Sequence, residues 1–151
     1  MTAEETAGLL ASQRKVQLAT NGPDGFPHLV TMYYVMINGK IAFWTYRSSQ
    51  KARNLERDPR ISCLVETGEQ YFDLRGMLLQ GTATRTDDPA EVAWIGRQIT
   101  TVLSGPGAQA LSGAGTEADL AEYVERAARK RCGYFVEPNR VISWNHAKLL
   151  A

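Results

Sequence analysis

The chain has 151 residues, which is the usual length of one domain. Its 17 Lys and Arg residues against 16 Asp and Glu residues give a formal net charge of +1 at pH 7. This balance argues against a broad basic surface for nucleic-acid phosphates, so any recognition of an anion must be local. We expect a single domain over residues 1–151.

The N-terminus and the cysteines indicate a cytoplasmic protein without a metal site. Acidic residues precede the first apolar ones, and no apolar run approaches the ~20 residues that a membrane span needs. Cys63 and Cys132 lie in apolar, strand-like runs without a second cysteine or a histidine at metal-ligand spacing. Both are expected to be buried thiols that pack as small apolar side chains.

The first half of the chain predicts a helix, three strands and a second helix. Thr2 and Glu5 form a capping-box pattern for the first helix. Strand-like runs at 15–20, 26–37 and 41–46 are separated by Asp-Gly and Asn-Gly turns, which predicts an antiparallel meander. Residues 48–59 then have helical character, with Ser48 or Ser49 as the cap and Asp58-Pro59 as the end.

The second half predicts further strands with a helical excursion before the last ones. Residues 60–66 and 71–86 read as strands, and Gly76 and Gly81 mark points of bulging or close approach. A helix over 87–103 begins at Asp87 or Asp88, and another covers 117–130. Residues 131–151 contain two strand-like halves joined at 137–139. About six strands without βαβ alternation predict a mainly β, antiparallel barrel of the Greek-key type with flanking helices.

The start of the second helix concentrates positive charge directly after a strand. Arg47, Lys51 and Arg53 lie beside two serines. Free amides and the positive dipole end of a helix, together with a lysine, suit a phosphate or carboxylate. The alternative is a solvated helix face whose cations pair with Glu56 and Asp58. Neither nucleotide-binding glycine fingerprint is present.

The histidines and aromatic residues are less specific. His28 and His146 have no ligand partner nearby in the sequence and are expected to be ordinary hydrogen-bonded histidines. Aromatic residues are frequent on the predicted strands, where they could line a pocket for a flat ring, although filling the core or a dimer interface is the commoner role. No catalytic residue can be named from these patterns.

Three stretches together resemble a known family. They are GFPHLVTMYY (25–34), FWTYRSSQKARNLERDPRISCLV (43–65) and LRGMLLQGTAT (74–84), and the likeness resumes at PNRVISWNHAKL (138–149). The pattern resembles the pyridoxamine 5'-phosphate oxidase-like split-barrel family of flavin and deazaflavin proteins. The C-terminal stretch is similar to the actinobacterial B-type branch of flavin/deazaflavin oxidoreductases, which mostly use coenzyme F-420.

The resemblance implies a homodimer with a cofactor in each of two grooves between the subunits. Arg75 would approach the cofactor from the partner side, and Trp144 and His146 match a C-terminal motif near the site. The remaining positions that match cofactor-binding residues are Leu29, Val30, Thr31 and Met32 along the ring, Trp44 and Thr45 from the next strand, and Ser49, Gln50, Lys51 and Arg53 at the phosphate or acidic tail.

Two departures bear on the activity. Oxidases that make pyridoxal phosphate carry Arg-Lys in place of Gln50-Lys51 and Arg-Gln in place of Arg75-Gly76, so that reaction is not expected. The resemblance implies instead an F-420-dependent reductase whose small-molecule acceptor is bound by variable loops such as Ser104 to Thr116. The alternatives are an FMN-binding oxidase or flavin reductase, a non-catalytic F-420-binding protein, and a haem-binding split barrel with His28 or His146 as ligand.

Overall fold

Seven strands form one antiparallel sheet in the order β2-β1-β5-β6-β7-β4-β3. The structure is a computed structural model that describes residues 1–104 and 117–150. The strands are β1 (Lys15–Asn21), β2 (Pro27–Tyr33), β3 (Val35–Ile37), β4 (Lys40–Tyr46), β5 (Arg60–Thr67), β6 (Arg75–Thr86) and β7 (Arg131–Asn145). The helices are α1 (Ala3–Ser12), α2 (Gln50–Arg57), α3 (Pro89–Leu103) and α5 (Glu117–Ala128), with short 3₁₀ helices η1 (Tyr71–Asp73) and η2 (His146–Leu150).

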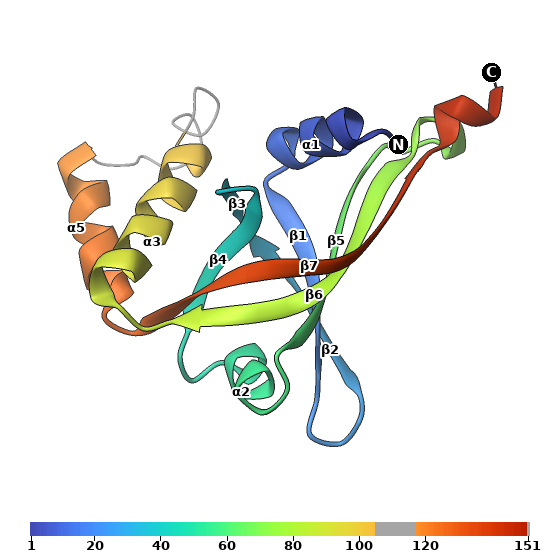
Figure 1. The fold of residues 1–151 in the computed structure, drawn as a ribbon. Coiled ribbons are helices and arrows are strands. Elements are labelled where there is room, and N and C mark those ends of the chain that lie inside the picture. Colours follow the sequence, from blue (N-terminus) through green and yellow to red (C-terminus); the bar gives the residue numbers. More distant parts are fainter. Residues whose placement is uncertain (105–116, 151) are drawn as a thin grey trace.

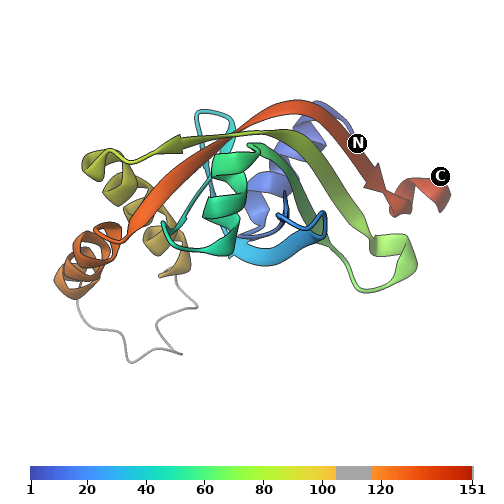
Figure 2. The same ribbon diagram turned by 90° about the horizontal axis from the view of Figure 1, so that it is seen from below.

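The sheet curls into a half-barrel, which confirms the predicted mainly β split-barrel fold with flanking helices. Helices α3 and α5 lie side by side at one end, and β6 and β7 cross the front as two long neighbouring strands (Figure 1). Helix α2 lies across the opening of the half-barrel when the molecule is seen from below (Figure 2). The curvature allows one face of the sheet to enclose a core.

The helices begin where the sequence predicts. Thr2 and Glu5 form a complete capping box at α1. Ser49, not Ser48, caps α2, and its Oγ accepts from the Ala52 amide at 3.3 Å. Asp88 caps α3 by accepting from the Glu91 amide at 3.1 Å, with a proline next in the chain. These side chains satisfy amides that have no acceptor inside the helix.

The strand count differs from the predicted six because the run at 26–37 is two strands. Tyr34 separates β2 from β3: its ring is buried, its hydroxyl donates to the Leu10 carbonyl at 2.7 Å, and its amide donates to the Arg14 carbonyl at 3.1 Å. These contacts anchor the chain to α1 and the turn after it. Asn38 and Gly39, both with positive φ, then make the tight turn between β3 and β4.

The later strands also differ in their limits. Residues 71–73 form η1, so β6 begins only at Arg75. The two halves of the C-terminal segment are one strand, β7, with a register shift where Gln80 pairs with Arg140 and Gly81 with Pro138. A Cβ on Gly81 would overlap the carbonyl oxygen of Glu137, so glycine allows this close approach. The predicted bulge at Gly81 is therefore confirmed.

The sheet has cores on both sides. Alternate residues of the strands fill the barrel, among them Val16, Phe43, Val65 and Met77. Ala42 and Trp44, on the other face of β4, pack against α3 in a second core. Cys63 and Cys132 are buried free thiols, as expected.

The far end of β6 and β7 forms a projecting arm with η1 and η2, which we call the arm (residues 71–77 and 142–150) (Figures 1 and 2). Within it, the His146 amide donates to the Leu74 carbonyl at 2.9 Å, and Tyr71 packs edge-on against Phe72. Lys148 pairs with Glu5 of α1 at 2.8 Å. The aromatic rings of Tyr71 and Phe72 nevertheless remain exposed.

Within residues 1–104 and 117–150, no helix is both long and apolar enough to cross a membrane. The same residues contain no group of three or more His, Cys, Asp or Glu side chains placed to hold a metal ion.

Replacement of Gly96 by alanine should destabilise the protein. A Cβ at Gly96 would overlap the six-membered ring of Trp44, whereas a Cβ at Gly8 of α1 would meet no atom within 4 Å. We expect Gly96→Ala to lower the free energy of unfolding by about 1–3 kcal/mol through overpacking. Gly8→Ala, the matched control, should raise it by up to about 1 kcal/mol. Urea unfolding measures both, and equal effects of the two substitutions would contradict this packing.

Candidate functional site

The segment 45–51, which we call the β4–α2 corner, connects strand β4 to helix α2. It brings three polar side chains together. Lys51 Nζ donates to Thr45 Oγ1 at 3.2 Å, and Thr45 Oγ1 donates to Ser49 Oγ at 3.3 Å. Thr45 is buried because its side chain points into the barrel at the end of β4. Ser49 is fixed by its role as the cap of α2. The structure therefore brings Thr45, Ser49 and Lys51 into one hydrogen-bonded chain.

Lys51 carries a charge without a carboxylate beside it. Within the described residues, Lys51 makes no ion pair, and its one hydrogen bond goes to the Thr45 hydroxyl. Partial burial lowers the pKa of Lys51, and the nearby Cys132 thiol acts weakly in the opposite direction. A cation that has lost part of its water and has no counter-ion attracts an anion.

The first amides of α2 lie beside this lysine. The Ala52 amide is taken by Ser49 Oγ, and the Arg53 amide by the Ser49 carbonyl at 3.1 Å. The amides of Gln50 and Lys51 precede the first intrahelical acceptor, as in every α-helix. They add two donors and the positive end of the helix dipole to the Lys51 ammonium.

Two other cations near α2, Arg57 and Arg60, behave differently from Lys51. Arg60 holds Asp58 through its guanidinium at 2.7–3.2 Å, and Arg57 donates to the Asn21 carbonyl at 2.6 Å. Asp58 is thereby occupied, so it does not neutralise Lys51. The alternative of a helix face whose cations pair with Glu56 and Asp58 therefore does not describe Lys51.

Gln50 and Arg53, the other two predicted tail-binding residues, are exposed on α2. Gln50 Nε2 donates to Asn54 Oδ1 at 2.8 Å, and the buried Asn54 in turn donates to Thr20 Oγ1 at 3.0 Å. This pair of bonds ties α2 to β1. Asn54 was not predicted to be buried, since asparagine on a short polar helix is usually solvated.

The four predicted residues of β2 face two ways. Val30 and Met32 pack against the barrel core, whereas Leu29 and Thr31 lie on the outer face of the sheet, with Leu29 68% exposed. Since side chains alternate along a strand, a ring lying on one face can contact only half of them by side chain. β2 is also an edge of the sheet, so one side of its backbone is free for hydrogen bonds.

The side chains of Trp44 and Thr45 lie on opposite faces of β4. Trp44 points to the opposite face of β4, where it packs against α3 and lies 4.7 Å from the Arg131 guanidinium. Adjacent residues of a strand cannot share a face, so Trp44 reaches the corner by its backbone alone.

Arg75 and Trp144 lie together in the arm, remote from the corner of their own chain. Trp144 pairs with Gly76 and its indole covers that glycine. Thr45 pairs with Cys132, and Trp144 lies twelve positions further along β7, which is about 40 Å of strand. Within one chain Trp144 and His146 therefore lie far from the corner, and Figure 1 shows the arm pointing away from α2. That they lie near a site formed between two subunits stays a prediction.

The histidines follow the expectation only in part. His146 Nδ1 lies 2.8 Å from the Tyr71 carbonyl oxygen, as in an ordinary hydrogen bond. His28 Nδ1 is buried on the inner side of β2 without a hydrogen-bond partner among the described residues. The Ser104 to Thr116 loop, expected to bind the acceptor, lies outside the described residues except for Ser104.

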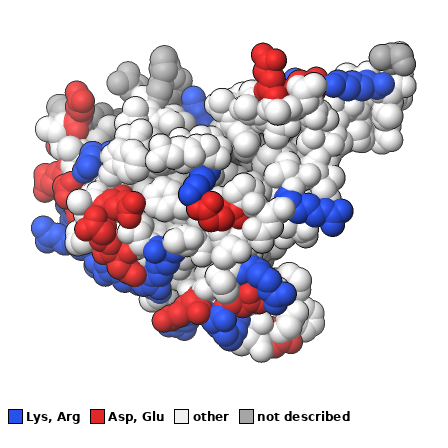
Figure 3. Space-filling view, in the orientation of Figure 1, with Lys and Arg blue, Asp and Glu red and all other residues white. Residues whose placement is uncertain are grey.

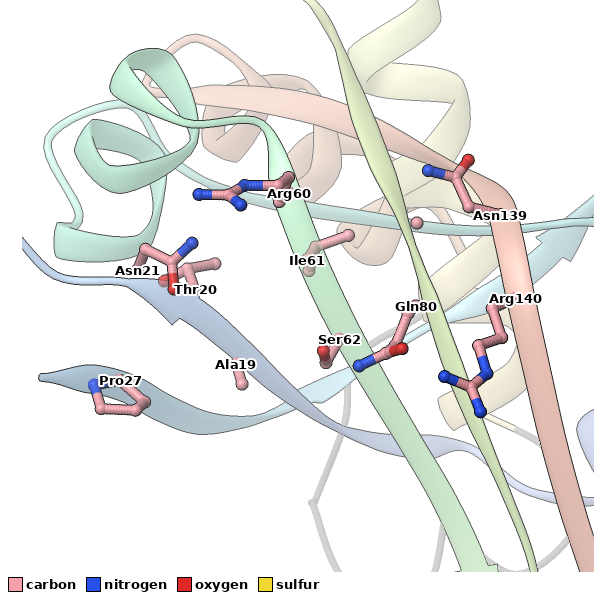
Figure 4. A pocket seen from close by; sticks show the side chains of 11 residues that line it. Ala19, Thr20, Asn21, Pro27, Arg60, Ile61, Ser62, Gln80, Asn139 and Arg140 are labelled. Carbon is pink, nitrogen blue, oxygen red and sulfur yellow. The ribbon is translucent and has the colours of Figure 1, made fainter. Parts of the chain in front are cut away.

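A separate hollow of about 500 Å³ lies on the outer face of the sheet. Ala19, Ser62, Gln80 and Arg140 cross it as paired neighbours on β1, β5, β6 and β7, and Arg60 stands at its end (Figure 4). Thr45, Ser49 and Lys51 do not line this hollow.

Surface charge is mixed on the face seen in Figure 3, where Lys and Arg lie interspersed with Asp and Glu. No broad basic area dominates this face, which agrees with the near-zero net charge. An anion at the β4–α2 corner would therefore be attracted by local contacts and not by a broad basic surface.

Two sets of contacts near the corner were not predicted. Arg47 donates to Asp87 Oδ1 at 3.3 Å and to the Arg129 carbonyl at 2.9 Å. The Arg131 guanidinium lies between the rings of Trp44 and Tyr46, at 4.7 and 4.2 Å from their centres. Nothing in the sequence pairs these residues, because 40 or more positions separate Arg47 and Tyr46 from their partners.

Solved structures share this architecture. The conserved hypothetical protein Rv2991 from Mycobacterium tuberculosis is 36% identical, with a TM-score of 0.84, and the match covers 100% of this chain and 89% of that one. A protein described as an F420 reductase is 22% identical with a TM-score of 0.65, covering 89% and 94% of the two chains. HutZ, a haem storage protein from Vibrio cholerae, is 16% identical with a TM-score of 0.66, covering 93% and 92%.

Sequence comparisons define the family. Curated protein sequences give no match. The family profile described as pyridoxamine 5'-phosphate oxidase matches residues 2–111, which is more than half of the chain and includes β1 to β6, the β4–α2 corner and α3. The split-barrel fold agrees with this match. The chain therefore belongs to the pyridoxamine 5'-phosphate oxidase family.

Proposed function

We propose that this protein is an oxidoreductase that binds a phosphate-bearing deazaflavin, coenzyme F-420, at the β4–α2 corner. The observation that carries the proposal is the Lys51 ammonium, which is partly desolvated, has no carboxylate partner in the described structure and lies beside the first amides of α2. An anion of the size of a phosphate supplies the charge that this lysine lacks.

The donor set at the corner fits a phosphodiester. Lys51 offers the two N–H groups that Thr45 does not take, and the amides of Gln50 and Lys51 point out of the helix end. Ser49 and Thr45 hold each other and the lysine in place. Positively charged donors together with backbone amides are the usual partners of phosphate oxygens.

The edge strand β2 is the proposed support for the ring. Its outward backbone groups can bond the polar edge of an isoalloxazine-like ring, and Leu29 and Thr31 offer side chains on the outer face. Arg53 and Gln50, exposed on α2, are placed for the acidic tail beyond the phosphate. This strand and helix would hold ring and tail in one orientation, which is how a protein of this kind contributes to rate.

The bound cofactor, in its reduced form, would supply a hydride to a small conjugated or otherwise electrophilic molecule. This chain's own residues bind and orient: Lys51 holds the tail, and β2 sets the face of the ring that the acceptor meets. The similarity in fold to a protein described as an F420 reductase supports this reading.

FMN is the second candidate cofactor, because the family takes its description from an oxidase and FMN also carries a flat ring and a phosphate. Fluorescence titration with F-420 and with FMN distinguishes the two by affinity. Turnover with reduced F-420 and a panel of unsaturated acceptors then separates a reductase from a protein that only binds the cofactor.

We further propose that the cofactor site is completed by a second copy of this chain. Arg75 and Trp144 match cofactor-binding positions of the family but lie about 40 Å of strand away from the corner of their own chain. They can meet a cofactor bound there only from a partner subunit. Exposed apolar side chains on the outer face of the sheet, such as Leu29 and Ile142, suit such an interface.

Substitution of Lys51 by alanine should weaken cofactor binding. We expect a loss of about 1.5–3 kcal/mol in the binding free energy of F-420 or FMN, as for the loss of a charge-assisted contact. Fluorescence titration measures it, with Arg126→Ala as the control because Arg126 is an exposed cation of α5 that pairs with Glu122 on the same helix. Equal affinity in wild type and Lys51→Ala would refute the proposal that Lys51 binds the phosphate.

Cofactor affinity should fall as the pH rises through the pKa of Lys51. Burial lowers that pKa in the free protein, and a bound anion favours the ammonium form, so affinity is full below the free-protein pKa and declines above it. The dissociation constant measured against pH tests this. Lys51→Arg keeps its charge throughout and should give a flatter profile. Identical profiles would rule out Lys51 as the titrating group.

Mixing two defective subunits should restore binding. A homodimer of Lys51→Ala, or of Arg75→Ala, would lack one binding residue in both of its sites. A hybrid dimer of the two variants would contain one site in which both residues are intact. Random exchange should therefore restore about a quarter of the sites. Cofactor titration after denaturation and refolding of the mixture measures the recovery. A mixture no better than its components, or a monomeric wild type, would contradict a shared site.

A further inference from the structure

The β4–α2 corner, which contains the proposed phosphate-binding Lys51, is exposed. Contacts from other parts of the chain restrain it. Tyr46, Arg47 and Ser48 are all exposed, and within the corner the Ser49 amide donates to the Tyr46 carbonyl at 3.0 Å. A short exposed turn with one internal backbone bond opens easily unless other contacts restrain it.

Arg47 provides three of these contacts. Its amide donates to the Lys130 carbonyl at 3.1 Å and its guanidinium to the Arg129 carbonyl at 2.9 Å, so it is bonded to the turn between α5 and β7. Its Nε donates to Asp87 Oδ1 at 3.3 Å, which lies between β6 and α3. The Arg47 side chain thus joins the corner to both ends of the helical excursion, the segment between β6 and β7 that contains α3 and α5.

Asp87 is itself fixed by a second arginine. Arg85 donates to both carboxylate oxygens, at 2.7 and 2.9 Å. The pKa of Asp87 is lowered, first by the Arg85 hydrogen bonds and less by Arg47, so the carboxylate stays charged at neutral pH. Arg47 therefore bonds to an acceptor whose position is set by β6 and not by the exposed corner.

Arg131 restrains the same segment from its other side. Its guanidinium lies between the rings of Trp44 and Tyr46 and donates to the Ala127 carbonyl of α5 at 3.0 Å. Residues on both sides of Thr45 are thus held by the helical excursion, although neither α3 nor α5 supplies a residue to the proposed anchor.

We propose that Arg47 is a positioning residue that, through Asp87, holds the β4–α2 corner in the arrangement that binds the cofactor's phosphate. The inference rests on the proposed function for its ligand. Thr45, Ser49 and Lys51 keep the hydrogen bonds among themselves. The contacts of Arg47 with the segment between β6 and β7 limit how far these three residues move. Cofactor affinity then depends on contacts that the cofactor does not make.

The test compares Asp87→Asn with Glu125→Gln. Both remove one carboxylate charge from an exposed ion pair of the same helical region, but Glu125 pairs with Arg97 at 2.9 Å and does not touch the corner. The dissociation constants of FMN and of riboflavin, which lacks the phosphate, are measured for both variants. Hydrogen exchange of residues 46–51 is measured on the cofactor-free proteins.

We expect Asp87→Asn to weaken FMN binding roughly two- to fivefold, in line with the loss of a partly exposed ion pair, and to leave riboflavin binding unchanged. It should also speed amide exchange at the corner, whereas Glu125→Gln should change neither quantity. Wild-type exchange and FMN affinity in Asp87→Asn would overturn the proposal. Equal weakening of FMN and riboflavin with a lower melting temperature would also overturn it, as a general loss of stability.

Arg47→Lys separates positioning from direct contact. A lysine keeps the charge but cannot bond Asp87 and the Arg129 carbonyl together in the planar arrangement of a guanidinium. The variant should behave like Asp87→Asn, and wild-type FMN affinity in it would refute the positioning role. If the wild type binds no cofactor, the proposed function fails. Faster exchange at the corner in Asp87→Asn would then still support the restraint, and unchanged exchange would refute it.

Discussion

The period-two alternation of β4 is the constraint on which the site depends. This strand is buried on both faces: Phe43 and Thr45 point into the barrel, and Ala42 and Trp44 point to α3. The apolar residues fix the register of the strand, because a slip by one position would exchange the two sets. Thr45 therefore lies on the inner side of the corner. Its hydroxyl accepts a hydrogen bond from Lys51 Nζ and donates one to Ser49 Oγ.

The same constraint connects the helical excursion with the proposed anchor. Trp44 fills the contact between β4 and α3 only because Gly96 leaves room for its ring. Arg131, Arg47 and Asp87 then join the end of β4 to the turns that flank α3 and α5. A segment that adds no residue to the anchor thus limits the freedom of the residues that form it, and packing and polar contacts act together there.

Curvature and length of the strands separate two groups of residues that the family pattern places in one site. β6 and β7 run the whole length of the sheet, with the corner near one end and the arm at the other. The side chains of Arg75 and Trp144 therefore lie beyond the reach of Lys51 in the same chain. A site built from both groups requires two chains, which is the physical basis for proposing a shared site.

The sequence by itself determined the class of fold, the helix starts to within one residue and the resemblance to the family, because these depend on local patterns: turn dipeptides, capping residues and alternating apolar positions. It also placed Lys51 in the first turn of a helix that begins at Ser48 or Ser49. The tertiary structure alone decided that Tyr34 divides a strand, that Asn54 is buried, that Lys51 has no carboxylate beside it in the described structure, and that Trp44 and Thr45 separate. Each of these depends on residues far apart in the chain, whose meeting is fixed by sheet register and packing.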